Sequence, residues 1–219
     1  MTAMSVKAVG FDLDGTLIDS RLDLANAVNL VRREFSLPPL PLDLVVSYVG
    51  NGVKVLLQRS LEGDLPNESD MLHAHELMGK IYFEHALDNT KLYSGVDVML
   101  KTLAEKGKIL ALFTNKPEFV ARYILEKLAV ADYFSDVAGG GGKFPLKPNP
   151  EAMLDFATRR KLSVGEIAML GDHYTDLEFA RRSGAIGVFA AYGFGETRNE
   201  KYAFKIDNPL DLLDLDIVL

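Results

Sequence analysis

Two aspartates, Asp12 and Asp14, are separated by a single residue and directly follow the apolar run 6–11. If this run is a strand, both carboxylates leave the sheet at its carboxyl edge, where open α/β sheets place their active sites. Side chains at positions i and i+2 of an extended segment point the same way, so the two negative charges repel each other. A divalent metal ion and a phosphate group are the ligands that would best offset this repulsion.

These two carboxylates suggest two chemical roles. One can act as a nucleophile and form an acyl phosphate, and the other can protonate the leaving oxygen and later activate water. Gly15 lets the chain turn away from the strand, and Thr16 can donate hydrogen bonds from its hydroxyl and its backbone. Taken alone, the segment could also be an Asx-type turn with a helix cap.

A second group of polar residues, Thr114-Asn115-Lys116, ends the next strongly predicted strand. Hydroxyl and amide donors at the carboxyl edge of a sheet could hold phosphate oxygens. The same residues could instead cap the helix that is expected to begin at Pro117. The motif by itself leaves both interpretations open.

Lys147 lies between the glycine run Gly139–Gly142 and a predicted helix, with prolines on both sides. A lysine fixed at this point could neutralise both the nucleophile and the phosphate. Lys143, on the flexible glycine loop, is the competing candidate. Because prolines stiffen the chain around Lys147, we favour Lys147.

Two further aspartates, Asp172 and Asp176, follow the predicted strand at 167–171. Asp172 is expected at the strand tip, and Asp176, one helical turn later, can face the same way. Carboxylate oxygens are suitable ligands for Mg²⁺, which binds few protein groups and keeps several waters. The alternative is that Asp172 only caps a helix and Asp176 is exposed.

Short apolar strands alternate with amphipathic helices in the C-terminal part of the chain. The expected strands are 6–12, 108–114, 134–138, 167–171 and 186–190, with an edge strand at 204–206. The expected helices are 117–127, 150–160 and 175–183. This alternation predicts an α/β fold, a doubly wound, Rossmann-like and mainly parallel sheet with helices on both faces.

The stretch from residue 18 to residue 89 differs, because helical spacing dominates it and no convincing strand interrupts it. Helices are expected at 23–35, 52–61 and 69–87. We therefore predict a helical cap domain at 18–89, inserted into a discontinuous core of 1–17 and 90–219. Its expected hinges are 17–20 and 89–95, and it would lie over the carboxyl edge of the sheet.

Composition narrows the range of functions. The 219 residues are 48% apolar and 25% charged, which is ordinary for a globular protein, and no apolar run is long enough to span a bilayer. The net charge of -7 argues against nucleic acid and anionic membranes as partners. The absence of cysteine excludes disulfides and thiol nucleophiles. We expect no signal peptide, a cytoplasmic location, a small phosphorylated metabolite as partner, and a monomer or homodimer.

In this order, the four polar segments resemble the motifs of the haloacid dehalogenase superfamily of phosphatases, and the resemblance covers nearly the whole chain. Val49-Gly50-Asn51-Gly52 in the cap and Thr114-Asn115-Lys116-Pro117 resemble segments of the phosphoglycolate phosphatases within it. The resemblance implies a Mg²⁺-dependent phosphomonoester hydrolase that forms an aspartyl-phosphate. It makes 2-phosphoglycolate the leading substrate.

The resemblance also implies a role for each motif. Asp12 would attack phosphorus in line, and Asp14 would act first as general acid and then as general base. Thr114 and Asn115 would bind the phosphoryl oxygens, and Lys147 would stabilise the charge of the transferring group.

The implied metal site takes the Asp12 carboxylate, the Asp14 backbone carbonyl and the Asp172 carboxylate as ligands of Mg²⁺. Asp176 would orient Lys147 or a metal-bound water, and Thr16 would support this loop from outside the ligand set.

The chain also departs from the family pattern. His173-Tyr174-Thr175 replaces the Ser-Arg-Asn that often fills this loop in phosphoglycolate phosphatases, so substrate preference is less certain than metal binding. The dehalogenases of the superfamily lack the second aspartate, so the presence of Asp14 argues against a dehalogenase activity for this chain. In the cap, Gly50, Asn51 and Gly52 are the candidates for substrate selection.

Three alternative functions stay open at this stage. A phosphosugar mutase of the β-phosphoglucomutase kind would use the same aspartyl-phosphate but return the phosphoryl group to a sugar. A pyrophosphatase would use the same motifs on a different substrate. A non-catalytic module that binds a phosphorylated ligand is the third, and the presence of every catalytic position argues against it.

Overall fold

The computed structural model describes residues 6–63, 68–216 and 218, and its centre is a six-stranded sheet. The strands are β1 (Ala8–Phe11), β4 (Ile109–Pro117), β5 (Phe134–Gly140), β6 (Ile167–Gly171), β7 (Ile186–Ala190) and β8 (Phe204–Ile206). Their order is β5-β4-β1-β6-β7-β8, and all neighbouring pairs are parallel. The predicted α/β class is confirmed.

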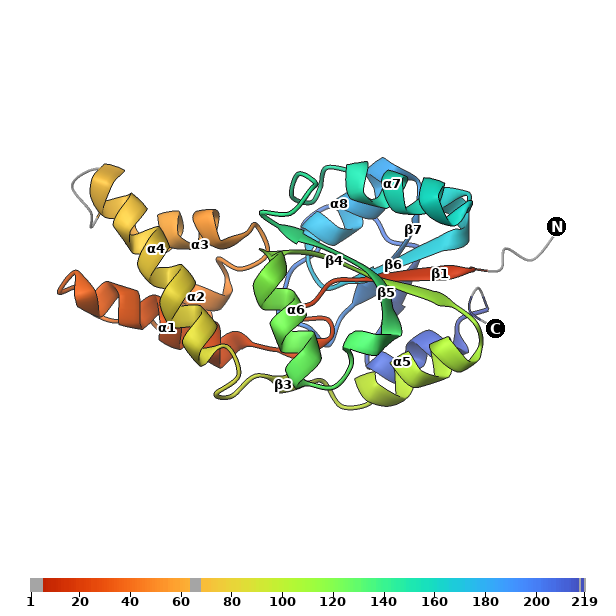
Figure 1. Cartoon of the computed structure of the whole chain (residues 1–219), viewed down its shortest axis with the longest axis horizontal. Coiled ribbons are helices and arrows are strands. Elements are labelled where there is room, and N and C mark those ends of the chain that lie inside the picture. The colour runs from red at the N-terminus through yellow and green to blue at the C-terminus, as the bar shows by residue number, and fades with distance from the viewer. Residues whose placement is uncertain (1–5, 64–67, 217, 219) are drawn as a thin grey trace.

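Helices cover both faces of this sheet (Figure 1). Helices α5 (Val96–Glu105) and α6 (Glu118–Lys127) lie on one face, and α7 (Glu151–Arg160) and α8 (Tyr174–Ser183) lie on the other. Strand β1 is at the centre and all four of its residues are buried, as expected for a strand that is covered on both sides. The successive residues Ala8 and Val9 of β1 join different clusters, since Ala8 packs with Phe156 and Phe179, whereas Val9 belongs to the cluster of Ile124.

The remaining helices form a separate group beyond one end of the sheet (Figure 1). They are α1 (Arg21–Glu34), α2 (Leu42–Val46), α3 (Val53–Leu61) and α4 (Glu68–His85). Helix α1 packs against the other three through Leu24, Val28 and Val31, the residues with helical spacing. None of the described helices has the length and apolar composition needed to cross a membrane.

Two short strands join the helical group to the rest of the chain. Strand β2 (Ile18–Asp19) pairs antiparallel with β3 (Lys91–Leu92), so the segments that lead into and out of the helices lie side by side. The division into a core of 1–17 and 90–219 and a cap of 18–89 stays a prediction, and residues 1–5, 64–67, 217 and 219 of that division lie outside the described residues. We keep the name cap for α1–α4 and their connections.

The element boundaries expected at two places are wrong. Strand β4 does not end at Thr114 but continues to Pro117, because Pro117 pairs with Gly140 of β5 after a shift in register. The segment 18–89 also begins with a strand, β2, which is too short to show any periodicity and depends on β3 for its hydrogen bonds. Helices α2 and α5 were not expected from the sequence.

Candidate active site

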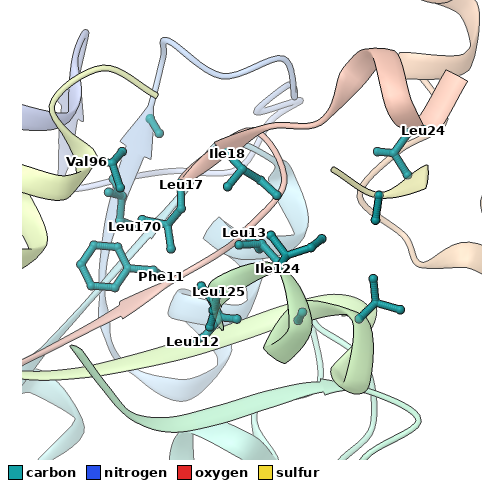
Figure 2. Close-up of a cluster of buried hydrophobic side chains, with 14 of the residues drawn as sticks. Phe11, Leu13, Leu17, Ile18, Leu24, Val96, Leu112, Ile124, Leu125 and Leu170 are labelled. Atoms are coloured by element: carbon teal, nitrogen blue, oxygen red, sulfur yellow. The ribbon is translucent and has the colours of Figure 1, made fainter. Parts of the chain in front are cut away.

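The loop after β1 is built around Leu13, which lies between the two aspartates and is fully buried. Figure 2 shows Leu13 within the hydrophobic cluster, where Ile124 of α6 also lies. The Leu13 carbonyl accepts hydrogen bonds from three successive backbone N–H groups, those of residues 16–18, at 2.9 to 3.2 Å. This tight turn fixes the loop, and Asp12 and Asp14 line the cavity beside it.

Lys147 joins Asp12 to Asp176. Its ammonium nitrogen Nζ lies 2.8 Å from Oδ1 of Asp12 and 2.6 Å from Oδ1 of Asp176, and all three side chains are buried. Burial and the charge of Asp176 raise the pKa of Asp12 to about 6, although Lys147 acts in the opposite direction. Burial alone would lower the pKa of Lys147, and the two carboxylates raise it.

The Asn115 side chain holds the Lys147 segment in place. Its Oδ1 accepts from the Lys147 backbone N–H at 2.7 Å, and its Nδ2 donates to the Lys147 carbonyl at 3.0 Å and to the Gly50 carbonyl at 2.9 Å. Thr114, the other residue expected to bind phosphate, is buried and lines the cavity. The competing lysine, Lys143, instead pairs with Asp155 at the surface.

Asp172 follows β6 and is tied down by the loop after β7. The backbone N–H groups of Phe194 and Gly195 donate to its Oδ2 at 3.0 and 2.8 Å, and the Thr16 hydroxyl donates to its Oδ1 at 3.4 Å. Gly15 has a φ of +84°, and a Cβ there would lie 2.0 Å from Oδ2 of Asp172. Glycine is therefore required for the first loop to come this close to Asp172.

Three buried carboxylates, those of Asp12, Asp172 and Asp176, can direct one oxygen each into a space where these atoms lie within 4.8 Å of one another. Burial and the two neighbouring carboxylates raise the pKa of Asp172 well above its usual value. Since Lys147 is the ammonium group that pairs with this cluster, negative charge remains in excess. Oxygen ligands with excess negative charge suit a hard divalent cation, so the cluster fits a metal ion.

Asp176 is held by the start of α8. His173 is the N-cap residue of that helix, and its backbone N–H donates to Oδ2 of Asp176 at 3.0 Å. The other oxygen, Oδ1, receives Lys147. Both oxygens therefore have protein partners, which is consistent with the predicted task of orienting Lys147.

A second ion pair, between the buried Lys116 and the part-buried Asp14, was not expected from the sequence. Nζ of Lys116 lies 2.7 and 2.8 Å from the two carboxylate oxygens of Asp14, and the Ser20 hydroxyl donates to Oδ1 of Asp14 at 2.5 Å. Lys116 follows Thr114 at the i+2 spacing of a strand, which places both on one face of β4. This i+2 spacing could have predicted that Lys116 faces the same side as Thr114. It was not used, because the strand was expected to end at Thr114.

A cavity of about 800 Å³ lies between the sheet edge and the cap. Its lining includes Asp12, Asp14, Thr114, Asn115, Lys116 and Asp172 from the sheet edge, and Gly50, Gly52, Val53, Leu56, Met78 and Tyr82 from the cap. The predicted catalytic aspartates and the last residues of β4 thus share one cavity with the cap.

The cap loop at 50–52 lies directly against the loop after β6. A Cβ on Gly50 would lie 2.6 Å from the ring of His173, and the Tyr174 hydroxyl donates to Oδ1 of Asn51 at 2.7 Å. The Nδ2 of Asn51 is buried and has no hydrogen-bond partner among the described residues. Gly50 and Gly52 line the cavity, whereas the side chain of Asn51 is directed to Tyr174.

The chain is similar to known proteins over most of its length. Residues 9–190 match the family model described as haloacid dehalogenase-like hydrolase. The chain is 36% identical to a phosphoglycolate phosphatase of Vibrio vulnificus, with 100% of this chain and 99% of the relative covered, and 33% identical to one of Chromobacterium violaceum, with 98% of each covered. A structure of a predicted phosphoglycolate phosphatase from Haemophilus somnus superposes with a TM-score of 0.91 at 30% identity, covering 95% of this chain and 97% of that one.

Proposed function

Because this chain belongs to the haloacid dehalogenase-like hydrolases, we propose that it hydrolyses 2-phosphoglycolate through an aspartyl-phosphate on Asp12, with Mg²⁺ as cofactor. The resemblance stated from the sequence and the assignment as a phosphoric monoester hydrolase are both confirmed by the relatives. The substrate, the metal and the intermediate are the parts that this proposal adds. The cytoplasmic location stays a prediction.

The observation that supports this proposal most strongly is the position of Lys147 between Asp12 and Asp176. Phosphoryl transfer depends mainly on positioning and on positive charge beside the transferring group. Lys147 holds one oxygen of Asp12 at 2.8 Å and leaves the other oxygen of that carboxylate available. A nucleophile that is fixed by a buried ammonium loses little freedom when the substrate arrives.

The reaction would proceed in two displacements. An oxygen of Asp12 attacks phosphorus, the bond between phosphorus and the ester oxygen breaks, and the Asp14 carboxyl gives its proton to that oxygen, which leaves as glycolate. Water then attacks the phosphorus of the acyl phosphate and gives a proton to Asp14. The bond to Asp12 breaks, which releases inorganic phosphate and restores both aspartates.

The carboxylates of Asp12 and Asp172 and the backbone carbonyl of Asp14 would hold Mg²⁺. When bound, the ion would neutralise charge on the phosphoryl oxygens. The side chain of Asn115 is already bonded to Gly50 and Lys147, so its proposed part in phosphate binding would be to position Lys147 and the cap loop.

A screen for phosphate release tests the proposal. The protein is assayed with and without Mg²⁺ on 2-phosphoglycolate, pyrophosphate and several hexose phosphates. We expect the highest kcat/KM for 2-phosphoglycolate, and no release after the divalent cation is removed by a chelator. Absence of Mg²⁺-dependent hydrolysis across the whole panel would contradict the proposal.

The same screen separates the alternatives. Conversion of β-glucose 1-phosphate to glucose 6-phosphate without free phosphate would favour a mutase. A clear preference for pyrophosphate would favour a pyrophosphatase.

A further inference from the structure

We propose that Lys116 and Tyr82 form a subsite for the carboxylate of the substrate, next to the site of phosphoryl transfer. This inference rests on the proposed function, because it identifies the residues that would recognise a phosphomonoester with a second negative charge. Neither residue was assigned a role in the two displacements on Asp12, although Lys116 pairs with Asp14.

Lys116 is the buried cation of the cavity wall. Its side chain is 2% exposed, and it lies on the segment that also carries Thr114 and Asn115. The other basic side chains in the described lining include Lys54 and Arg122, which are both exposed, and Arg122 pairs with Glu118. A buried ammonium is expensive to maintain without a partner, and Asp14 is that partner in this structure. Because Lys116 lines the cavity, an anionic ligand bound there could pair with the same ammonium.

Tyr82 provides a second and independent observation. Its side chain comes from α4 of the cap and is buried, and its hydroxyl lies close enough to the Lys116 ammonium to interact with it but has no acceptor for its own proton among the described residues. A buried tyrosine hydroxyl normally donates to a partner, and an ammonium cannot accept a hydrogen bond, so the proton of this hydroxyl remains available to a ligand at the cavity wall. Burial raises the pKa of Tyr82 to about 12, which keeps the proton on the hydroxyl.

The two groups lie close enough to act on one ligand. The Lys116 ammonium lies 4.5 Å from the centroid of the Tyr82 ring. One side chain comes from β4 of the sheet and the other from the cap, so the subsite is complete only when the cap lies over the sheet edge. A ligand held by both residues would also stabilise this closed arrangement.

The pairing of Asp14 with Lys116 indicates that a carboxylate fits beside this ammonium. Both of its carboxylate oxygens lie within 2.8 Å of the Lys116 ammonium, at 2.7 and 2.8 Å. A carboxylate of the substrate has the same shape and charge, so it can share or take over this ammonium. Asp14 would then be free to turn toward the leaving oxygen, which couples recognition of the second charge to the proton transfer.

The test compares two esters that differ only in the recognised group. Ethylene glycol monophosphate has a hydroxymethyl group where 2-phosphoglycolate has its carboxylate. The ratio of kcat/KM for the two esters is measured for the wild type, Lys116→Met, Lys116→Arg, Tyr82→Phe and the control Lys54→Met, which removes an exposed lysine from the same cavity. A ratio measured in one sample does not depend on the fraction of folded enzyme.

We expect the wild type to prefer 2-phosphoglycolate and Lys116→Met to reduce this preference about 100-fold. Tyr82→Phe should reduce it about 10-fold, because one hydrogen bond to a charged group is lost. Lys116→Arg should keep most of the preference, and Lys54→Met should leave it within about threefold of the wild type.

Equal losses on both esters in Lys116→Met and in Tyr82→Phe would overturn the subsite and leave Lys116 with the single task of holding Asp14. Equal kcat/KM for the two esters in the wild type would also overturn it. If the wild type hydrolysed neither ester, the proposed function itself would be contradicted. This result can be told apart from failure of the subsite alone, in which the wild type still hydrolyses both esters.

Discussion

The carboxylate cluster at the sheet edge and the cap wall opposite it differ in how completely their polar groups are bonded. Asp172, Asp176 and Lys147 each have at least two hydrogen-bond partners within the protein. In the cap, the hydroxyl of Tyr82 and the Nδ2 of Asn51 are buried without an acceptor among the described residues. The sheet edge is therefore fully organised before substrate binds, whereas the cap still offers donors.

This difference separates two properties of the enzyme. Groups that are already fixed favour the transition state without reorganisation, so the sheet edge should determine whether the reaction occurs. Groups that remain unpaired gain most when a ligand arrives, so the cap, together with Lys116 beside Tyr82, should determine which ester is used. Substitutions on the two sides should therefore change different kinetic parameters.

The largest effect is expected at the sheet edge, from Asp12→Asn. The amide is a poor nucleophile, so kcat should fall by at least about 10⁴-fold. Lys147 keeps its bond to Asp176, so the fold should be retained and the unfolding temperature should stay within about 5 °C of the wild type. Steady-state kinetics and a thermal melt check the two parts. Near-normal activity in this variant would reject Asp12 as the nucleophile.

A smaller but still large loss is expected for Gly15→Ala. A Cβ at this position would lie 2.0 Å from Oδ2 of Asp172, so one of the two loops must move and kcat should fall about 100-fold. Gly184→Ala is the matched control, because Gly184 has a similar φ of +88° and nothing within 4 Å of its Cβ position. The control should lose about 1 kcal/mol of stability and keep its activity. Equal kinetic losses in both variants would mean that the close approach to Asp172 has no role.

Asp23 of α1 holds together the segment that enters the cap and the segment that leaves it. Its carboxylate accepts four hydrogen bonds from Asn89 and Thr90, at 2.7 to 2.9 Å, so the start of the cap is tied to the segment that leaves it. Asp23→Ala should lower the free energy of unfolding by about 3 kcal/mol at pH 7. Glu84→Ala, an exposed change in α4, should alter it by less than about 0.5 kcal/mol.

The effect of Asp23 should also depend on pH. Burial acts to raise the pKa of this carboxyl, but the hydrogen bonds from Asn89 and Thr90 outweigh it and hold the pKa below the usual value. The contribution of Asp23 is then fully present above the unfolded pKa of about 3.9 and is lost as the pH falls through the lower folded pKa. Denaturant unfolding between pH 7 and pH 3 should show the difference between wild type and variant shrinking below about pH 4. A constant difference would contradict this explanation.

The smallest effect is expected in the cap loop, from Asn51→Ala. Asn51 is bonded to Tyr174 and not directed into the cavity, so its loss should act by shifting the loop at 50–52. The preference between 2-phosphoglycolate and hexose phosphates should change about threefold to tenfold, with less change in phosphate release from a small generic ester. Equal changes for all esters would count against the cap loop as a specificity element.

Much of the sheet edge could be predicted from the sequence, because its parts are local. Asp12, Asp172 and Lys147 each follow an apolar strand or precede a helix, and parallel strands bring such positions to one edge. Topology alone then places them together, as the cluster of Asp12, Asp172 and Asp176 with Lys147 shows. The strand that carries Thr114 was also expected, although its end was placed three residues too early.

The other half of the cavity could not be predicted, because it depends on how two distant parts of the chain pack. Tyr82 lies in the last turn of α4, and nothing in its sequence neighbourhood distinguishes it from a core residue. Lys116 was visible in the Thr114-Asn115-Lys116 motif, but its partner Asp14 is 102 residues away. Strand β2 could not be predicted for the same reason. Two residues are too few to show a hydrophobic period, and the strand with which they pair is far away in the sequence, at 91–92.

The central claim, that Asp12 carries the phosphoryl group, can be tested directly by rapid acid quench and mass spectrometry. The wild type is mixed with excess 2-phosphoglycolate and Mg²⁺ and stopped within the first turnovers, and the peptides are compared with those of Asp12→Asn. We predict one added phosphoryl group on the peptide that contains Asp12, and none in the variant. Steady phosphate release with no phosphorylated Asp12, or with the phosphoryl group on another residue, would contradict the account.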